Sequence, residues 1–175
     1  TLFCETFEPP QVTIGSLDGQ NSWNATHNVL VQDAISDSGG SSLLICAHSN
    51  ETGVASHAIN ASTNKTVWID CRVSHEDFAN AELPSVSPFV LAFVFDAFGH
   101  PVMTDGFTIV TNTAFVCDTK EYFHRVTMHL DFNLHRWNLY IDGILAGENL
   151  SMRGENPALN EIFFEGDYGF ADDIK

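Results

Sequence analysis

The chain has 175 residues, of which 44% are hydrophobic and 11% aromatic, a composition that indicates a globular protein and excludes a disordered one. It carries 23 Asp and Glu residues against 7 Lys and Arg, and the scattered basic residues do not form the positive cluster that nucleic-acid binding requires. The longest apolar run, 89–95, has only the length of a strand, so no membrane span is expected. The formal charge of −16 leaves two interpretations open, a solvated acidic surface or cation binding.

Short runs of alternating apolar and polar residues are separated by Gly, Pro, Asn, Asp and Ser, and no sustained helical stripe occurs. This spacing predicts an antiparallel all-β protein. In the first half of the chain, strands are expected at 2–8, 28–34 and 41–48. The segments 9–23 and 49–64 are interrupted by Gly, Pro and polar residues, which predict irregular structure, the second segment with at most one short edge strand.

The second half of the chain opens with a clear strand at 65–74 and a long polar connection at 75–88. Two strands are expected within 89–105. Further strands are expected in the segments 106–119, 158–166 and 168–175. Because no linker, internal repeat or low-complexity segment interrupts the chain, a single domain over residues 1–175 is predicted.

The ribbon 124–143 shows the alternation most clearly, in two runs separated by a short polar gap. The apolar residues of the two runs are Val126, Met128, Leu130, Phe132, Trp137, Leu139 and Ile141. The polar and amphipathic residues between them are Arg125, Thr127, His129, Asp131, Asn138, Tyr140 and Asp142. Residues two apart in a strand share a face, so the ribbon predicts a hairpin with one buried face, including Trp137, and one exposed face.

Three motifs, in this order and spacing, resemble bacterial LamG-like jelly rolls of the concanavalin A-like lectin/glucanase superfamily. The first is a Gly-x-Leu-x-Gly-Gln-x-x-Trp stretch at 15–23, which follows a Phe-Glu pair. The second is a hairpin at 122–148 that ends in a Tyr-hydrophobic-Asp-Gly turn, with Phe123 where the family often has Trp. The third is the closing "GDYGFADDIK", which stops at Lys175, a few residues earlier than is usual in the family.

The resemblance implies a two-sheet antiparallel jelly-roll sandwich of the concanavalin A-like type, with the first and last strands adjacent. Much less follows for function, because this fold carries lectins, glycosidases, lyases and adhesins. The family resemblance covers both ends and much of the second half of the chain. Within 25–65 only the general strand character matches.

Catalytic patterns of the superfamily are not found in the sequence. Laminarinase-type glycosidases carry Glu-x-Asp-x-x-Glu on one strand, and the chain has no such motif. Glu76 and Asp77 are adjacent and would point apart in a strand, and Glu161 and Glu165 are too far apart for a close pair. The lyase motifs are also missing, and an anionic glycan would need a strong positive patch on this acidic protein. We therefore expect a protein that is not an enzyme.

Sugar binding uses aromatic side chains with polar groups beside them. Trp68 lies on the strand face opposite Ile69, beside Asp70 and Arg72, and is the best candidate for stacking on a sugar. His129 and Tyr140 share a face of the predicted hairpin, either as part of a ligand site or as an ordinary cross-strand pair. The candidate ligand-binding residues are therefore Trp68, Arg72, His129 and Tyr140.

Calcium is the candidate ion, because members of the superfamily often hold it at a loop rim with hard oxygen ligands. Asp172 and Asp173 are the candidate ligands, unless one of them caps the closing strand and the other is solvated. The cysteines at 4, 46, 71 and 117 form no Cys-x-x-Cys pair, and their disulfide pairing or free thiol state stays open. Five Asn-x-Ser/Thr triplets are glycosylation acceptors in a eukaryotic secreted protein or chance matches, at Asn24, Asn50, Asn60, Asn64 and Asn149.

Taken together, these features predict a secreted, extracellular module for recognition or adhesion, whose leader has been removed. Its expected partner is a glycan or a protein of the cell surface or matrix, with calcium as a candidate cofactor. The alternative is a structural subunit of a filament or surface layer that self-assembles through sheet edges. A polysaccharide-active enzyme is the least favoured interpretation.

Overall fold

The computed structural model describes residues 5–37, 39–45, 52–59, 65–74, 91–96, 98–104, 108–117, 122–154 and 158–166. Within these ranges the regular structure is strand, apart from one short 3-10 turn, η1 (Gln20–Ser22), and no helix has the length and apolar character of a membrane span. The strands pair antiparallel, so the all-β prediction is confirmed at that level. The jelly-roll connection stays a prediction.

The strands belong to two compact units, which we describe separately. Unit 1 comprises positions 1–62 and 159–175, and unit 2 comprises positions 63–158. The expectation of a single domain over 1–175 stays a prediction.

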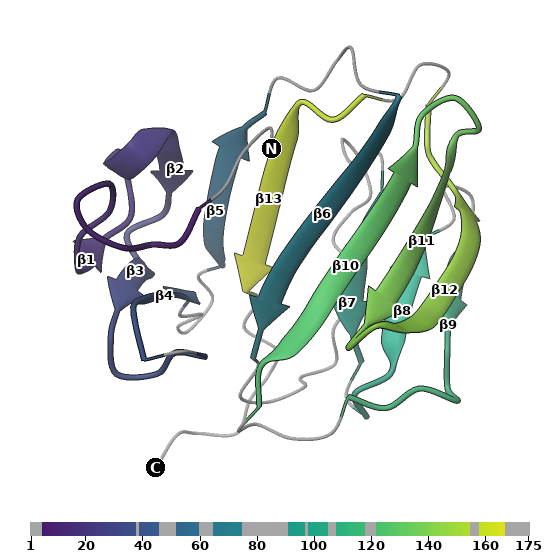
Figure 1. The fold of residues 1–175 in the computed structure, drawn as a ribbon, viewed down its shortest axis with the longest axis horizontal. Helices are drawn as coiled ribbons and strands as arrows, with labels where there is room; N and C mark the ends of the chain where they lie inside the picture. Colours follow the sequence, from purple (N-terminus) through teal and green to yellow (C-terminus); the bar gives the residue numbers. More distant parts are fainter. Residues whose placement is uncertain are drawn as a thin grey trace. The chain divides into compact units, whose positions relative to one another are not determined.

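Unit 1 contains two three-stranded sheets, with the strand orders β1-β3-β4 and β13-β5-β2 (Figure 1). Its strands are β1 (Gly15–Ser16), β2 (Trp23–Ala25), β3 (Val29–Gln32), β4 (Ser42–Ile45), β5 (Gly53–Ala58) and β13 (Glu161–Gly166). β13 pairs with β5 from Glu161–Ala58 to Gly166–Gly53, so a segment from the late part of the chain completes a sheet of early strands.

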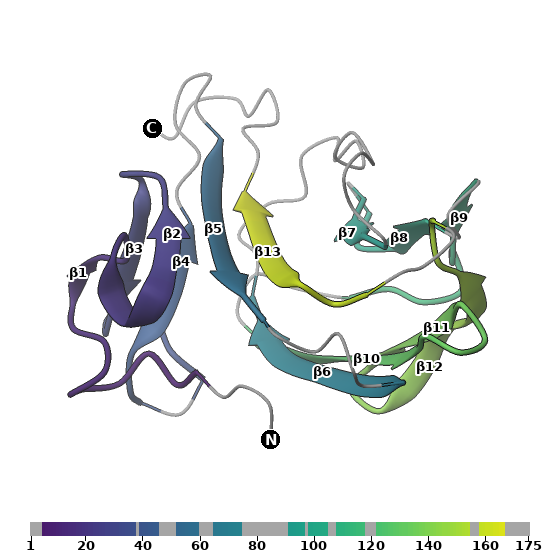
Figure 2. The same ribbon diagram turned by 90° about the horizontal axis from the view of Figure 1, so that it is seen from above.

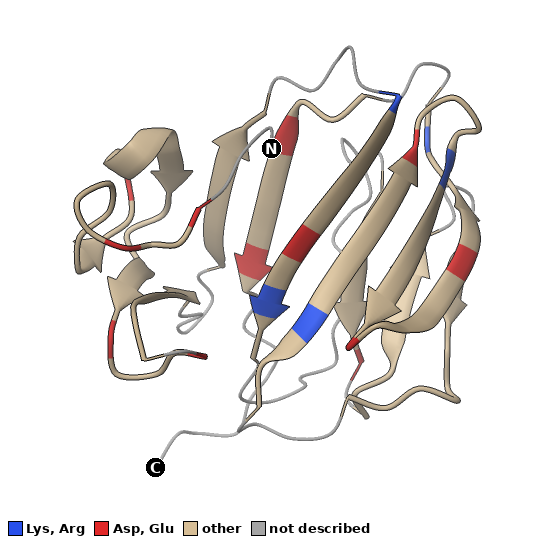
Figure 3. Ribbon diagram, viewed as in Figure 1, with Lys and Arg blue, Asp and Glu red and all other residues tan. Residues whose placement is uncertain are grey.

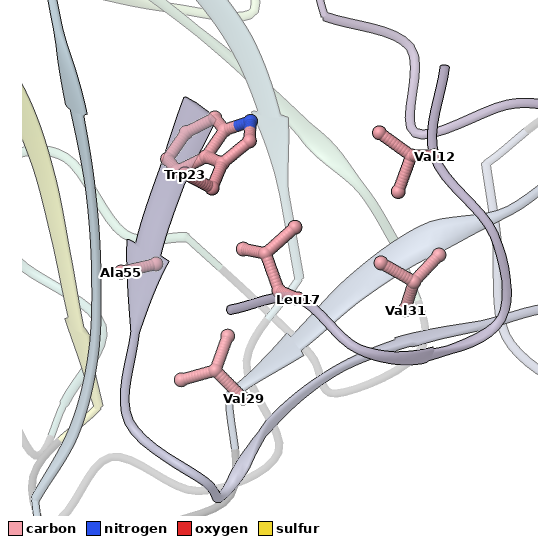
Figure 4. Close-up of a cluster of buried hydrophobic side chains, with 6 residues drawn as sticks. All are labelled: Val12, Leu17, Trp23, Val29, Val31 and Ala55. Carbon is pink, nitrogen blue, oxygen red and sulfur yellow. The ribbon is translucent and has the colours of Figure 1, made fainter. Parts of the chain in front are cut away.

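Both sheets of unit 1 contribute to one apolar core (Figure 4). Its buried members are Val12, Leu17, Trp23, Val29, Val31 and Ala55. The Gly-x-Leu-x-Gly-Gln-x-x-Trp stretch supplies two of them, and its Gln20 side chain donates hydrogen bonds to the carbonyls of Thr13 and Ser16. This motif therefore has a structural role: the glutamine fixes the loop that places Leu17 and Trp23 in the core.

Unit 2 contains a four-stranded sheet of order β12-β11-β10-β6 and a three-stranded sheet of order β7-β8-β9. Its strands are β6 (Thr66–Val73), β7 (Phe93–Phe95), β8 (Pro101–Thr104), β9 (Ile109–Thr111), β10 (His124–Asp131), β11 (Arg136–Ile141) and β12 (Ile144–Ser151). The two sheets form two layers, as Figure 2 shows. Between them, the Asn112 side-chain amide donates a hydrogen bond to the carbonyl of Ala146 over 2.7 Å.

One side of the four-stranded sheet is apolar, and we call it the covered face. Its fully buried side chains on the central hairpin are Val126, Leu130, Trp137, Leu139 and Ile141. Removing such side chains from water stabilises the fold by about 1.5–3 kcal/mol each. The sequence-based prediction that Trp137 belongs to the core is confirmed, since only 1% of its surface is exposed.

Several described elements differ from the expectation, among them β1, a short strand inside the segment 9–23 that is predicted to be irregular. The strand expected at 2–8 is not formed in its described part, because Phe7 has a φ of 58° and the Glu5 carboxylate accepts hydrogen bonds from the N–H groups of Thr6 and Phe7. β5 lies in the segment expected to be loop-like, where it is the central strand of its sheet rather than an edge. β12 was not predicted, because its register shifts break the alternation.

Two cysteines are described, and both are free thiols. Cys71 is partly buried, and it pairs in register with the buried Val126 of β10. Burial raises its pKa to about 11, and the nearby Asp70 adds to the effect. Cys117 is buried, and its pKa is likewise raised to about 11. Cys4 and Cys46 lie outside the described residues.

Candidate ligand-binding site

The opposite side of the four-stranded sheet carries exposed and half-buried aromatic and polar side chains, and we call it the aromatic face. The β6–β10–β11 register arranges these side chains in rows across the strands. The first row is Trp68, His129 and Asn138. The second row is Asp70, Thr127 and Tyr140. Alternation of side chains along each strand puts these six residues on one face, while the residues between them form the covered face.

Trp68 is the centre of an aromatic cluster. The His129 ring stacks on its indole with ring centroids 4.2 Å apart and an interplanar angle of 24°. The Tyr140 ring lies 6.3 Å away at an angle of 29°. Despite both contacts, 60% of the Trp68 surface is exposed. The indole is thus held by its neighbours and still presents a broad apolar surface to solvent.

Asp70 lies beside Trp68 on the same face of β6 and forms an ion pair with Arg125 of β10. The Arg125 Nε and Nη2 groups donate to the two carboxylate oxygens over 2.8–3.1 Å. The Thr127 hydroxyl donates to Oδ1 over 2.7 Å. Hydrogen bonding by Arg125 lowers the pKa of Asp70, partial burial acts in the opposite direction, and Thr127 adds to the lowering. Asp70 is therefore an ionised, well-oriented carboxylate at neutral pH.

Two positive and two negative side chains gather at this end of the sheet. Arg72 pairs in register with Arg125, as the neighbouring basic positions of β6 and β10 in Figure 3 illustrate. Arg72 also helps to lower the pKa values of Asp70 and Asp142. For Asp142, burial raises the pKa, but hydrogen bonds from the His124 ring and the Arg125 N–H outweigh it. Two guanidinium groups are thus balanced by two carboxylates.

The structure brings three of the four predicted ligand-binding residues together. Trp68, His129 and Tyr140 form the aromatic cluster, and the last two are not an ordinary cross-strand pair, because His129 lies opposite Asn138 and Tyr140 lies opposite Thr127. Arg72 is exposed on the same face, but it lies four residues from Trp68, about 13 Å along the strand at 3.3 Å per residue.

Sequence reasoning did not select four further residues of the aromatic face: Asp70, Arg125, Thr127 and Asn138. Asp70 could have been selected from its position two residues after Trp68 on a strand. Arg125 is 55 residues further along the chain, so its pairing with Asp70 depends on the register of β6 against β10. No local pattern specifies that register.

Other predicted sites fall largely outside the described part of the chain. The candidate calcium ligands Asp172 and Asp173 lie outside it, as do Asn50, Asn60 and Asn64. In the described part, no three His, Cys, Asp or Glu side chains are grouped as a metal site. The two described glycosylation candidates, Asn24 on β2 and Asn149 on β12, are both exposed.

Comparisons with known proteins do not extend this description. No protein-family model matches the chain, and neither a curated protein nor a solved structure does. The function is therefore inferred from the aromatic face and its chemistry.

Proposed function

We propose that the protein is a non-catalytic recognition module that binds a glycan through the aromatic face. The observation that carries the proposal is the position of Trp68, which is 60% exposed and contacts two other rings on a sheet whose other tryptophan, Trp137, is fully buried. Burying a large aromatic ring is strongly favourable, so an aromatic cluster left in solvent indicates a surface that gains by binding.

The chemistry of the aromatic face suits a sugar. One face of a pyranose ring presents C–H groups with a partial positive charge, which complement the negative π-face of an indole. The hydroxyl groups at the ring edge need donors and acceptors, and both kinds are supplied by Asp70 and Asn138 of the two rows and by Arg125, which is hydrogen-bonded to Asp70. A few oriented polar groups beside an apolar surface are the usual composition of a small-ligand site.

We infer a LamG-like jelly roll that acts outside the cell, supported by the three sequence motifs and by an antiparallel all-β structure. A protein of the cell surface or matrix is the other partner that such a module would take. Calcium at Asp172 and Asp173 is a separate proposal, and glycan stacking on Trp68 does not require it.

The direct test is binding of a glycan array to the wild-type protein and to Trp68→Ala. We expect wild-type binding to at least one glycan and a loss of ten-fold or more in affinity for Trp68→Ala, about 1.4 kcal/mol or more. Tryptophan emission also reports on the site in titrations with a bound glycan when the wild type is compared with Trp68→Ala, because Trp23 and Trp137 emit as well. Calorimetric titration of EGTA-treated protein with Ca²⁺ tests the calcium proposal independently.

The matched control is Leu134→Ala, in the turn between β10 and β11. Leu134 is an apolar residue with an exposed fraction similar to that of Trp68, 68% against 60%. It belongs to the β10–β11 hairpin of the same sheet but lies outside the rows of the aromatic face. Its glycan binding should equal that of the wild type. An array with no wild-type signal, or equal losses in both variants, would contradict glycan binding at the aromatic face.

A second candidate function, as a structural subunit, is favoured by one observation. β9 is an edge of its three-stranded sheet, and Ile109, Val110 and Thr111 are all exposed on it without a charged residue that would prevent edge pairing. Sedimentation over a concentration series tests for self-assembly. If assembly occurs through β9, Val110→Lys should abolish it, whereas glycan binding should not change.

A further inference from the structure

The Asp70–Arg125 pair has hydrogen-bonding capacity that the described part of the chain does not use. A guanidinium has five N–H donors, and Arg125 directs only its Nε–H and one Nη2–H at Asp70, which leaves about three donors. A carboxylate offers about four acceptor positions. Arg125 and Thr127 direct three hydrogens at Asp70, with the Nε–H of Arg125 shared between both oxygens, so about one position is left. Both side chains are accessible, with 45% of Asp70 and 59% of Arg125 exposed.

Stability alone does not account for such an arrangement. An exposed ion pair contributes little to folding, because water screens it and two side chains lose freedom. The pair lies next to the exposed indole, since Asp70 is two residues from Trp68 on the same face and Thr127 joins it to the row of Tyr140. Donors and an acceptor are therefore fixed beside an apolar ring.

The charge around the aromatic face disfavours an acidic ligand. Arg72 and Arg125 are balanced by Asp70 and Asp142, and the whole chain carries a formal charge of −16. The field of such a protein repels an approaching polyanion, and the face has no excess of cations to compensate. A neutral sugar meets no such barrier, and its hydroxyl groups can both donate to a carboxylate and accept from a guanidinium.

We propose that the aromatic face takes a neutral glycan, stacked on Trp68, whose hydroxyl groups bind the Asp70–Arg125 pair. This inference rests on the proposed glycan-binding function and names its ligand class. Asp70 serves as hydroxyl acceptor, and Arg125 both orients it and donates to the neighbouring hydroxyl oxygen. Binding then needs no net charge on the ligand.

The test uses sugar pairs that differ only in a carboxylate at C6. The probes are oligosaccharides of glucose, galactose and mannose, and the matched oligosaccharides of glucuronate, galacturonate and mannuronate, measured by calorimetry with the full chain. We expect the preferred neutral sugar to bind at least ten-fold more tightly than its uronate partner. The affinity for the neutral sugar should change less than about two-fold between about 50 and 500 mM NaCl at constant temperature and pH, because binding neutralises no net charge.

Asp70→Asn tests the role of the pair, with Glu148→Gln as the matched control. Both variants remove one negative charge from the same sheet, but Glu148 lies on β12, outside the two rows. We expect Asp70→Asn to weaken neutral-sugar binding about ten-fold or more and Glu148→Gln to leave it unchanged. Thermal unfolding of each variant verifies that it is folded.

The outcomes distinguish the inference of a neutral ligand from the proposed glycan-binding function on which it rests. Tighter binding of a uronate than of its neutral partner overturns the neutral class, while loss of that binding in Trp68→Ala would still support a glycan site. Unchanged neutral-sugar binding in Asp70→Asn overturns the role of the pair alone. If none of the probes binds and the glycan array is also silent, the proposed function and the inference both fail.

Discussion

The two faces of the four-stranded sheet in unit 2 are built from the same strands and differ in their exposure to solvent. On the covered face, Trp137 is 1% exposed among fully buried aliphatic side chains. On the aromatic face, Trp68 is 60% exposed and has ionised and amide side chains as neighbours. A one-residue offset along a strand determines which face a side chain occupies, so the same residue type can stabilise the fold or remain available for a ligand.

The two faces also differ in how much they contribute to the free energy of folding. Side chains of the covered face contribute to folding by leaving water, which is a large and non-directional effect. The aromatic face contributes little to folding, because its ion pair and its rings remain solvated. Substitutions should therefore divide cleanly between those that change stability and those that change binding.

Trp137→Ala should produce the largest effect on stability. Truncating a fully buried tryptophan costs about 3–5 kcal/mol, since transfer energy is lost and a cavity remains. Trp68→Ala should cost no more than about 1.5 kcal/mol, the contribution of an aromatic pair. Urea unfolding monitored by circular dichroism measures both. Similar costs for the two variants would show that the faces are not distinct.

The covered face also depends on a residue without a side chain. Gly147 of β12 packs against the buried Met103 of the second sheet, where an added Cβ would overlap the Met103 sulfur and lie 3.0 Å from the Leu150 Cδ1. Gly147→Ala should therefore destabilise unit 2 by about 1–3 kcal/mol, the usual cost of overpacking.

A double-mutant cycle provides the control for this contact. Met103→Ala removes the obstructing side chain, so Gly147→Ala should cost less in that background than in the wild type. Equal costs in both backgrounds would contradict the packing of β12 against β8 at this point.

The sequence predicts these faces well where alternation is regular. β6, β10 and β11 all lie where the pattern places them, and the assignments of Trp68 and Trp137 to opposite faces are confirmed. β12 was missed because a register shift beside Leu139 interrupts its alternation. β5 was missed because its small and polar residues resemble a loop, and pairing with β13 from far along the chain stabilises it as a strand.

The candidate site is predictable only in part for the same reason. A single strand shows that Trp68 and Asp70 share a face, because that follows from period two. The Trp68–His129 stack and the Asp70–Arg125 pair join β6 to β10 and depend on the register between the strands. This register is set by long-range packing, which the sequence pattern does not encode locally.

The alkylation rate of the Cys71 thiol should show a smaller effect, which measures how well the covered face excludes water. Burial raises the pKa of Cys71 from 9.0 to about 11, which lowers its thiolate fraction about 100-fold. We expect iodoacetamide to label Cys71 much more slowly in the native protein than in urea, as peptide mass spectrometry can measure. Equal native and denatured rates would mean that water reaches this face.

The smallest expected effect concerns Asp70 and acid. The pKa of Asp70 is lowered from 3.8, chiefly by the Arg125 hydrogen bonds, so folding favours its ionised form. The resulting stabilisation is present above the unfolded pKa and is lost as the pH falls through the folded pKa. Because the pair is exposed, Asp70→Asn should cost less than about 1 kcal/mol at pH 7. The difference in melting temperature between Asp70→Asn and wild type should therefore be small at pH 7, begin to shrink as the pH falls towards 3.8, and vanish once the pH is below the lowered folded pKa. A large difference at pH 7 would place the pair among the folding determinants, and the aromatic face would then no longer be separable from the covered face by its energetics.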